Sequence, residues 1–366
     1  MKIYLLAPNY CWHTSDLLEL SSFNKELQYI FIADTPPFIS RVLFNRFFSF
    51  LNIPYEFFQR LWRLFLFIPW SFYLRKRLIN DNPIHCHGLF SLIIAKFANI
   101  DSKRIVFTPQ GSDVLVLPEN NRIIKNFLKK NLSDLRFITA DSSLILEKCI
   151  NICPNLKKEN LMIIQNGIPL KKINNLVKRK SSKYKREIDI CWIRGLGKIY
   201  QFEYFLALIK MLSKLTPRKI NIAIISAYGS KFIPKEIFEY KNININLLPR
   251  LSSDEFLKCI FNSKIAVSIP SSDSSPRSVY ESVFLGCKLF LTKLDCLNWL
   301  PKDLQSKFLY SSGNLTRDVE ILINEINNFK EDEDLKNYFI KYREFSNNLK
   351  YSYIAKSYFE IFQKVI

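Results

Sequence analysis

The segment KIAVSIPSSDSSPRSVYESVFLGC, residues 264–287, decides the fold of this chain. It begins with an apolar, β-branched run at residues 265–269, which predicts a buried strand. A polar loop follows at 270–275, and Pro276 is a start signal for a helix. Gly286 is a suitable stop, because glycine is common just past the ends of helices. The loop therefore lies at the carboxyl end of a strand, where open α/β sheets bind their ligands.

The loop of this segment has the chemistry of a site for a phosphorylated ligand. The amides of Ser274, Ser275 and the first helical turn, which begins at Pro276, can face an anion, and the helix dipole adds to the attraction. Asp273 and Glu281 lie eight positions apart, one before the helix and one inside it. Carboxylates beside an anion site need other donors, and sugar hydroxyls are suitable. The segment predicts a phosphate site flanked by two hydroxyl-accepting carboxylates; an ordinary strand-to-helix turn is the alternative.

These residues resemble the Glu-x7-Glu motif of retaining glycosyltransferases, especially family 4, which has the GT-B fold. In that family the first carboxylate holds the transferred sugar, and the second holds the ribose of the nucleotide. By resemblance, Asp273 takes the first role and Glu281 the second. The chain departs from the motif on the sugar side, where Asp replaces Glu and Ser274 replaces the usual glycine.

The length of the chain indicates how many domains it has, and its net charge indicates what kinds of partner it binds. With 366 residues it exceeds the ~250–300 at which a single core stops growing, so we expect two domains. The formal charge of +20 indicates an anionic partner, such as membrane phospholipid, nucleotide phosphate or nucleic acid. A bias of composition towards lysine would explain the charge equally well, so the charge alone identifies no partner.

Cysteine and histidine form no metal-binding pattern in the sequence. The eight cysteines include no CxxC pair, and of the three histidines only His85 and His87 lie close together. We therefore expect no metal ion and no cofactor, the nucleotide sugar being a substrate. A reducing cytoplasm is the natural compartment for the unpaired thiols. The amino terminus predicts a strand because Pro8 interrupts it too early for a signal peptide, and no apolar run reaches the ~18 residues of a membrane span.

Strand-like and helical patterns alternate over the first half of the chain, as in a parallel, doubly wound sheet. The expected strands lie at residues 3–6, 27–33, 84–86, 104–108, 135–140 and 161–165. The expected helices between them include residues 89–99, 120–132 and 142–153.

Two strand ends of this first half carry candidate residues for the acceptor side. His87 precedes a glycine turn, and the family has a similar His-x-His-Gly at a strand end; such a histidine can contact phosphate or acceptor hydroxyls, so we predict a catalytic role. A structural imidazole is the alternative. The next strand ends in Gln110, Gly111 and Asp113, which we assign to the acceptor side. Family members often carry histidine where this chain has Gln110, which can hydrogen-bond a sugar but cannot titrate.

Residues 41–80 interrupt the alternation with a basic, aromatic segment. Pro54 and Pro69 are expected to divide it into short helices. One interpretation is an insertion that lies on an anionic membrane surface. The other is a helical hairpin packed on the sheet and covered by arginine stems.

The second half begins after a turn at residues 166–168, which resembles the family's Asn-Gly-Ile. Residues 171–186 hold eight Lys or Arg and no acid, which indicates a linker. The strand at 188–193 is followed by Arg194, Gly195 and Lys198. Two cations at this strand end can clamp a diphosphate as the nucleotide leaves. The family carries a similar Arg and Lys, usually five positions apart rather than four; a solvated loop is the alternative.

The remaining assignments also follow the resemblance. Arg250 lies near the position where the family binds the nucleotide base. The last helix, about residues 351–365, resembles the GT-B helix that returns to brace the first domain. The fold class we predict is α/β, GT-B, with two Rossmann-like doubly wound domains facing across a cleft. The domains would be 1–172 with a helical insertion at about 40–80, a basic linker at 173–186, a nucleotide-sugar domain at 187–345, and a returning helix at 346–366.

The predicted function is retaining, metal-independent transfer of a sugar from a nucleotide sugar to a glycan or lipid-linked acceptor, in biosynthesis of a surface polysaccharide. The expected location is the cytoplasm, including a peripheral position on the inner face of the plasma membrane. Two alternatives within the same fold are an epimerase-type enzyme and a non-catalytic nucleotide-sugar-binding protein. A nucleic-acid-binding protein is disfavoured, because the sequence contains no recognisable reading helix or aromatic stacking motif.

Overall fold

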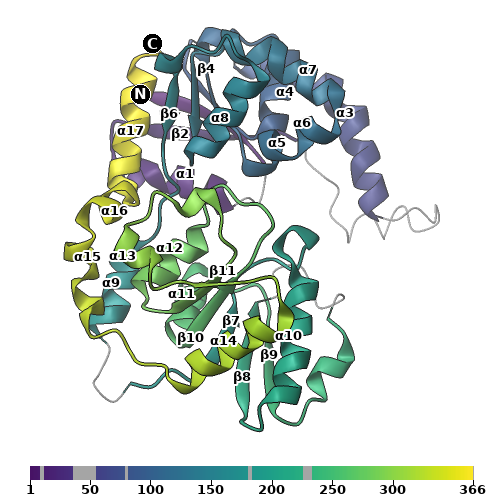
Figure 1. Cartoon of the computed structure of the whole chain (residues 1–366). Helices are drawn as coiled ribbons and strands as arrows, with labels where there is room; N and C mark the ends of the chain where they lie inside the picture. Colours follow the sequence, from purple (N-terminus) through teal and green to yellow (C-terminus); the bar gives the residue numbers. More distant parts are fainter. Residues whose placement is uncertain (9–11, 36–54, 79–80, 180–183, 226–232, 366) are drawn as a thin grey trace. The chain divides into compact units, whose positions relative to one another are not determined.

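The computed structural model describes residues 1–8, 12–35, 55–78, 81–179, 184–225 and 233–365 (Figure 1). The chain forms two compact units. The first comprises Met1–Asn166 together with Tyr351–Ile366, and the second comprises Gly167–Lys350. Each unit contains a six-stranded sheet, and every strand pair in both sheets is parallel.

The first unit has the strand order β2-β1-β3-β4-β5-β6. Its strands are β1 (Lys2–Ala7), β2 (Gln28–Ala33), β3 (Ile84–His87), β4 (Ile105–Thr108), β5 (Phe137–Ala140) and β6 (Leu161–Ile163). Its helices are α1 (Trp12–Phe23), α3 (Tyr55–Arg77), α4 (Leu89–Phe97), α5 (Gly111–Leu115), α6 (Leu117–Asn120), α7 (Arg122–Asn131), α8 (Ser143–Ile152) and α17 (Tyr351–Gln363). All six strands predicted for this part of the sequence are confirmed.

Helices cover both faces of the first sheet, because successive side chains of its strands enter different hydrophobic clusters. In β1, Leu5 belongs to the cluster that also contains the α17 residues Tyr358 and Phe362, whereas Leu6 belongs to the cluster beneath α4 and α8. Alternation of this kind is what a pleated strand buried on both sides requires. Helix α17, yellow in Figure 1, thus completes the first unit although it follows the second unit in sequence.

The second unit has the strand order β12-β11-β10-β7-β8-β9. Its strands are β7 (Ile188–Trp192), β8 (Ile220–Ile225), β9 (Ile243–Leu248), β10 (Ser263–Ser268), β11 (Lys288–Leu291) and β12 (Leu309–Tyr310). Its helices are α9 (Leu170–Lys178), α10 (Phe202–Leu215), α11 (Ser253–Phe261), α12 (Arg277–Phe284), α13 (Lys302–Gln305), α14 (Leu315–Asn327), α15 (Tyr338–Lys341) and α16 (Arg343–Asn348).

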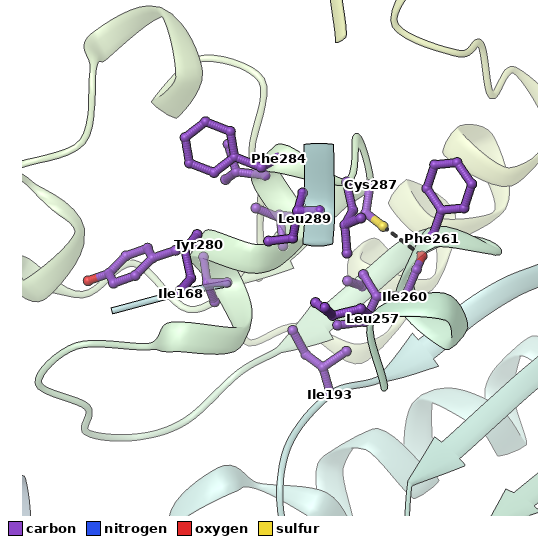
Figure 2. Close-up of a cluster of buried hydrophobic side chains, with 14 of the residues drawn as sticks. Ile168, Ile193, Leu257, Ile260, Phe261, Tyr280, Phe284, Cys287 and Leu289 are labelled. Atoms are coloured by element: carbon purple, nitrogen blue, oxygen red, sulfur yellow. Dashed lines mark hydrogen bonds between the residues drawn. The ribbon is translucent and has the colours of Figure 1, made fainter. Parts of the chain in front are cut away.

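Helix α12 is anchored in the core of the second unit. Tyr280 and Phe284 are fully buried, and Figure 2 shows them in the same buried cluster as Cys287. The Cys287 thiol donates to the carbonyl of Ile260 at 3.1 Å, which joins the end of the α12 segment to α11. The helix that follows the predicted ligand loop therefore has a fixed position relative to the sheet of its own unit.

The segment at residues 171–186, which the sequence predicted to be a linker, is partly buried in the second unit. Its first part belongs to α9, whose Ile173 and Val177 are buried in the core of the second unit. Its last residue, Arg186, is also buried and donates to the carbonyls of Phe261, Ser263 and Leu285 at 2.7–2.8 Å. The four-residue spacing of Ile173 and Val177 lies on one helical face, and the surrounding lysines hid this apolar pair.

The basic, aromatic segment is described only from Tyr55 onward; its residues 41–54 lie outside the described part, as do 79 and 80. The expectation that Pro69 divides it was wrong, because α3 continues through Pro69 to Arg77. Proline removes the donor to the carbonyl four residues earlier. That carbonyl belongs to Phe65, a residue that is 84% exposed as a whole, so this turn of the helix lies at the surface. No helix among the described residues is long and apolar enough to cross a membrane.

Candidate active site

The loop between β10 and α12 has the predicted form of strand, polar loop and helix. Strand β10 ends at Ser268, and α12 begins at Arg277 after Pro276. Gly286 ends the helical segment with a φ of 72°. Its amide donates to Val283 at 3.1 Å and the amide of Cys287 donates to Ser282 at 3.1 Å, the pair of bonds that defines a Schellman motif. The glycine stop predicted from sequence is confirmed.

Arg194 and Asp273 form an ion pair at the carboxyl edge of the second sheet. They meet because β7 and β10 are adjacent parallel strands, and each residue lies just beyond the end of one of them. The guanidinium also donates through Nε to the hydroxyl of Ser268 at 2.7 Å and lies over the ring of Tyr200 at 5.6 Å. The side chains of Arg194 and Asp273 are only 12% and 15% exposed, so the pair is largely withdrawn from solvent.

The two loops that carry this pair are joined by their backbones. The amide of Ser271 donates to the carbonyl of Ile199 at 2.8 Å. Lys198, which begins a short 3₁₀ turn, is exposed on the same loop as Arg194. Gly195 lies against Tyr200, and a Cβ there would approach the ring to 3.0 Å. The structure therefore holds Arg194, Gly195 and Lys198 beside the polar loop, as the sequence predicted.

The predicted anion site is partly filled by a carboxylate of the protein itself. Asp273 accepts the amide of Ser274 through Oδ1 at 2.8 Å while it pairs with Arg194. The Ser274 amide, which the sequence predicted to face the anion of a ligand, thus faces an anion of the protein in this structure. Ser275 is buried, and its hydroxyl lies 3.2 Å from the hydroxyl of Tyr280. A diphosphate would have to share these donors with Asp273.

Glu281, the predicted ribose contact, is paired with a cation that the sequence analysis missed. The Nε of Arg277 donates to Oε1 of Glu281 at 3.0 Å, and the two side chains are 18% and 5% exposed. The spacing of four residues on one helix was the available signal, because side chains at i and i+4 are neighbours. Arg277 adds a third cation to the residues around the loop, after Arg194 and Lys198.

Arg250 follows a different strand end. It is exposed just beyond β9, the edge strand, which β8 separates from β7. The structure thus places Arg250 at the same edge of the sheet as Arg194, but two strands away.

The predicted acceptor-side residues lie together at the carboxyl edge of the first sheet. Asp113 accepts two amides through Oδ2, those of Leu89 and Gln110, each at 2.8 Å. Its carboxylate thus joins the turn after β3 to the turn after β4, where Gly111 begins α5. Burial raises the pKa of Asp113, and the two amide donors oppose this shift. Gly88, which carries a φ of 97°, packs against Gln110 and Asp113.

The two histidines of β3 have different surroundings. His87 is the last residue of the strand and is 6% exposed. His85 is fully buried, with its ring nitrogens 3.2 Å from the hydroxyl of Tyr29 and 2.7 Å from that of Thr108. Burial lowers the pKa of His85 to about 3, so this imidazole is neutral in the folded protein. His87 stays the predicted candidate of the two.

Asp34 is a buried acid near His87, and the sequence analysis did not name it as a candidate site residue. It directly follows β2, is 1% exposed, and accepts the hydroxyl of Ser91 through Oδ2 at 2.9 Å. The same hydroxyl contacts the carbonyl of His87 at 3.0 Å, so Asp34 and His87 share one neighbour. An acid immediately after a strand was visible in the sequence, but its proximity to His87 depends on the position of β1 between β2 and β3.

Comparison with known proteins bears on the fold. No protein-family model and no curated protein matches the sequence. Among solved structures, a UDP-forming α,α-trehalose-phosphate synthase from Burkholderia xenovorans is 10% identical, with a TM-score of 0.66 over 99% of both chains. A trehalose-6-phosphate protein from E. coli bound with UDP-2-fluoro glucose is 12% identical, with a TM-score of 0.65 over the whole of both chains. A sucrose-phosphate synthase from Thermosynechococcus elongatus is 9% identical, with a TM-score of 0.67 over 100% of this chain and 98% of that one.

This chain has the GT-B fold. The predicted fold class is confirmed, because two parallel six-stranded sheets with flanking helices match these structures over their whole length. At 9–12% identity the likeness establishes the fold alone. The chemistry must therefore be argued from the residues at the two sheet edges.

Proposed function

We propose that this protein is a retaining glycosyltransferase that moves a sugar from a nucleotide sugar to a glycan or lipid-linked acceptor. The observation that carries the proposal is the ion pair of Arg194, on the loop after β7, with Asp273, on the loop that leads into the helix of Glu281. The cation and the sugar-directed acid therefore meet where these two loops are joined, and the ribose-directed acid lies on the helix that follows. The resemblance to family 4 transferases rests on the same residues.

Arg194 would hold the diphosphate of the donor and neutralise the charge that develops as the nucleotide leaves. It is already fixed by Ser268 and Tyr200, so little reorganisation is needed at the moment of reaction. Lys198 and the amides near Ser275 would complete the phosphate contacts. These groups supply the electrostatic stabilisation that a divalent metal supplies in other enzymes, which is why we propose a metal-independent reaction.

Glu281 would accept the ribose hydroxyls, and Asp273 would accept hydroxyls of the transferred sugar. In the retaining reaction the bond from the anomeric carbon to the phosphate oxygen breaks, and the bond to the acceptor oxygen forms on the same face. The acceptor's proton passes to the departing phosphate oxygen. This course follows the family resemblance.

The acceptor would bind the first unit, where His87, Gln110 and Asp113 lie at the carboxyl edge of the sheet. A lipid-linked glycan at the inner face of the plasma membrane fits the basic character of the chain, with a formal charge of +20. Biosynthesis of a surface polysaccharide is the process we propose for such an acceptor.

A thermal-shift screen against UDP, GDP, ADP and CMP sugars tests the donor site. A donor present at about one hundred times its Kd should stabilise the protein by about 2.7 kcal/mol. We expect the stabilisation to disappear in Glu281→Ala and to persist in Glu320→Ala, a control that removes an exposed acid from α14. If no nucleotide sugar stabilises the wild-type protein, the proposed function is wrong.

A turnover assay then separates the proposed transferase from its rivals in the same fold. A transferase consumes the donor only when an acceptor or water receives the sugar, whereas an epimerase-type enzyme converts the donor alone into a second nucleotide sugar. Binding without any turnover would indicate a non-catalytic nucleotide-sugar-binding protein.

A further inference from the structure

Helix α3 of the first unit carries apolar side chains on two opposite sides. One side faces the protein: Leu74 is buried, as is Leu78 just past the end of the helix, and Phe67 and Trp70 pack against the same cluster beneath α4. The other side, which we call the outer stripe, consists of Phe65, Ile68, Phe72 and Tyr73, which are 84%, 63%, 60% and 44% exposed.

The outer stripe follows the helical repeat. Its members are spaced three, four and one residues apart, so they form a continuous strip along one side of the helix. Single exposed apolar residues are ordinary, but several large ones in one strip mark a surface that binds a partner.

Cations border the apolar strip. Arg75, Lys76 and Arg77 are all exposed in the last turn of α3; Lys76 continues the outer stripe, and the other two lie on either side of it. Arg77 is held by the hydroxyl of Tyr73 at 2.6 Å, which keeps one cation beside the stripe.

Helix α7 of the same unit adds a second basic surface. Its exposed residues include four cations and one large apolar side chain: Arg122, Lys125, Lys129, Lys130 and Ile123, the last 79% exposed. Neither α7 nor the part of α3 from Phe65 onward contains an Asp or Glu.

We propose that the outer stripe of α3 lies on the surface of an anionic phospholipid bilayer. Phe65, Ile68 and Phe72 would enter the boundary between head groups and acyl chains, while Arg75, Lys76 and Arg77 contact lipid phosphates. A protein partner of mixed charge would leave these cations without enough anions, whereas a bilayer offers a continuous negative surface. The proposal rests on the proposed function, because a lipid-linked acceptor requires the enzyme to work at a membrane.

Co-sedimentation of the full chain with phosphatidylcholine vesicles, with and without phosphatidylglycerol, tests the surface. We expect binding only to the vesicles that contain phosphatidylglycerol. A triple variant in which Arg75, Lys76 and Arg77 are all changed to Gln should bind the vesicles roughly a hundred times more weakly. Each cation near an anionic surface raises the binding affinity by about a factor of five. The matched control replaces the exposed Lys214, Lys235 and Lys241 of the second unit by Gln, which gives the same net charge as the α3 variant. From the same contribution per cation, the control should bind the vesicles at least about ten times more tightly than the α3 variant.

A double variant in which both Phe65 and Phe72 are changed to Ser tests the apolar contribution to vesicle binding. This variant should lose vesicle binding, whereas Ser at Phe238 and Ile340, which are 47% and 77% exposed on the second unit, should not affect it. Thermal unfolding of each variant shows that it is folded. Equal loss in test and control variants, or a stripe variant that changes only self-association, overturns the proposal.

Vesicle binding is measured without any donor, and donor stabilisation is measured without vesicles. A protein that binds donors but not anionic vesicles refutes the membrane surface alone. A protein that binds vesicles through α3 but no nucleotide sugar refutes the proposed function alone.

Discussion

Replacing Asp273 with Asn should tighten the binding of a free nucleoside diphosphate while it slows sugar transfer. In the structure the Asp273 carboxylate occupies two groups that would hold the diphosphate, the guanidinium of Arg194 and the amide of Ser274. The substitution preserves the size of the side chain and removes its charge. The diphosphate would then no longer compete with a resident anion.

The size of the effect follows from Coulomb's law. Two unit charges about 5 Å apart repel by roughly 1–3 kcal/mol at effective dielectric constants of about 20–60. The residual exposure of 12% for Arg194 and 15% for Asp273 allows some screening by water. We therefore take the lower value of about 1 kcal/mol, which corresponds to roughly fivefold tighter binding. Loss of the sugar contact should lower kcat by about a hundredfold, as when one preorganised group is removed from a transition-state site.

Arg194→Gln provides the opposite case. It removes the cation itself, and hydrogen bonds to charged groups contribute about 1.5–3 kcal/mol, so the diphosphate should bind roughly ten to a hundred times more weakly. Calorimetric titration with the diphosphate found by the donor screen measures both variants. Asp254→Asn is the control, because it removes an acid of a surface pair, 2.7 Å from Lys172, near the start of α11. If Asp273→Asn weakens binding as much as Arg194→Gln does, the idea of a competing carboxylate is refuted.

Two further predictions concern stability. His85 should make the protein less stable in acid. Its pKa is about 3 in the folded protein and about 6.5 in the unfolded chain. As the pH falls below 6.5, the unfolded chain therefore takes up a proton at His85 and the folded protein does not, which favours unfolding. Between pH 7 and pH 5 this should cost about 2 kcal/mol of the free energy of unfolding; equal pH dependence in wild type and His85→Gln would contradict it. Arg186→Met should lower that free energy by about 3–5 kcal/mol, because it removes the buried donor of the carbonyls of Phe261, Ser263 and Leu285. Denaturant titration beside Lys185→Met, an exposed neighbour, measures the difference, and similar losses in both variants would show that burial of Arg186 carries no special contribution.

Local patterns predicted the parts of this structure that depend on neighbouring residues in sequence. The strand before the polar loop, the helix after Pro276 and the stop at Gly286 follow from periodicity and from backbone preferences. The meeting of Arg194 and Asp273 was also predictable, because both follow parallel strands of one sheet and such strand ends share an edge.

The sequence analysis failed to predict features of the structure in which a residue's partner lies far away in the chain. The burial of Arg186 depends on carbonyls some 75 to 99 positions away, and a run of lysines concealed it. The proximity of Asp34 to His87 depends on strand order. Composition indicated a break at Pro69, but α3 continues through it, with its inner side packed on the cluster beneath α4.

The discontinuous make-up of the first unit has a consequence for biogenesis. Its closing helix, α17, is translated only after every residue of the second unit has been added to the chain. The side chains Ile3, Leu5 and Tyr29, which α17 covers, are therefore open to water throughout most of synthesis. The second unit is contiguous and can fold as soon as it emerges, whereas the first must wait with one face of its sheet bare. Protection of that bare face by a chaperone would matter more for this protein than for one whose domains follow each other in the chain.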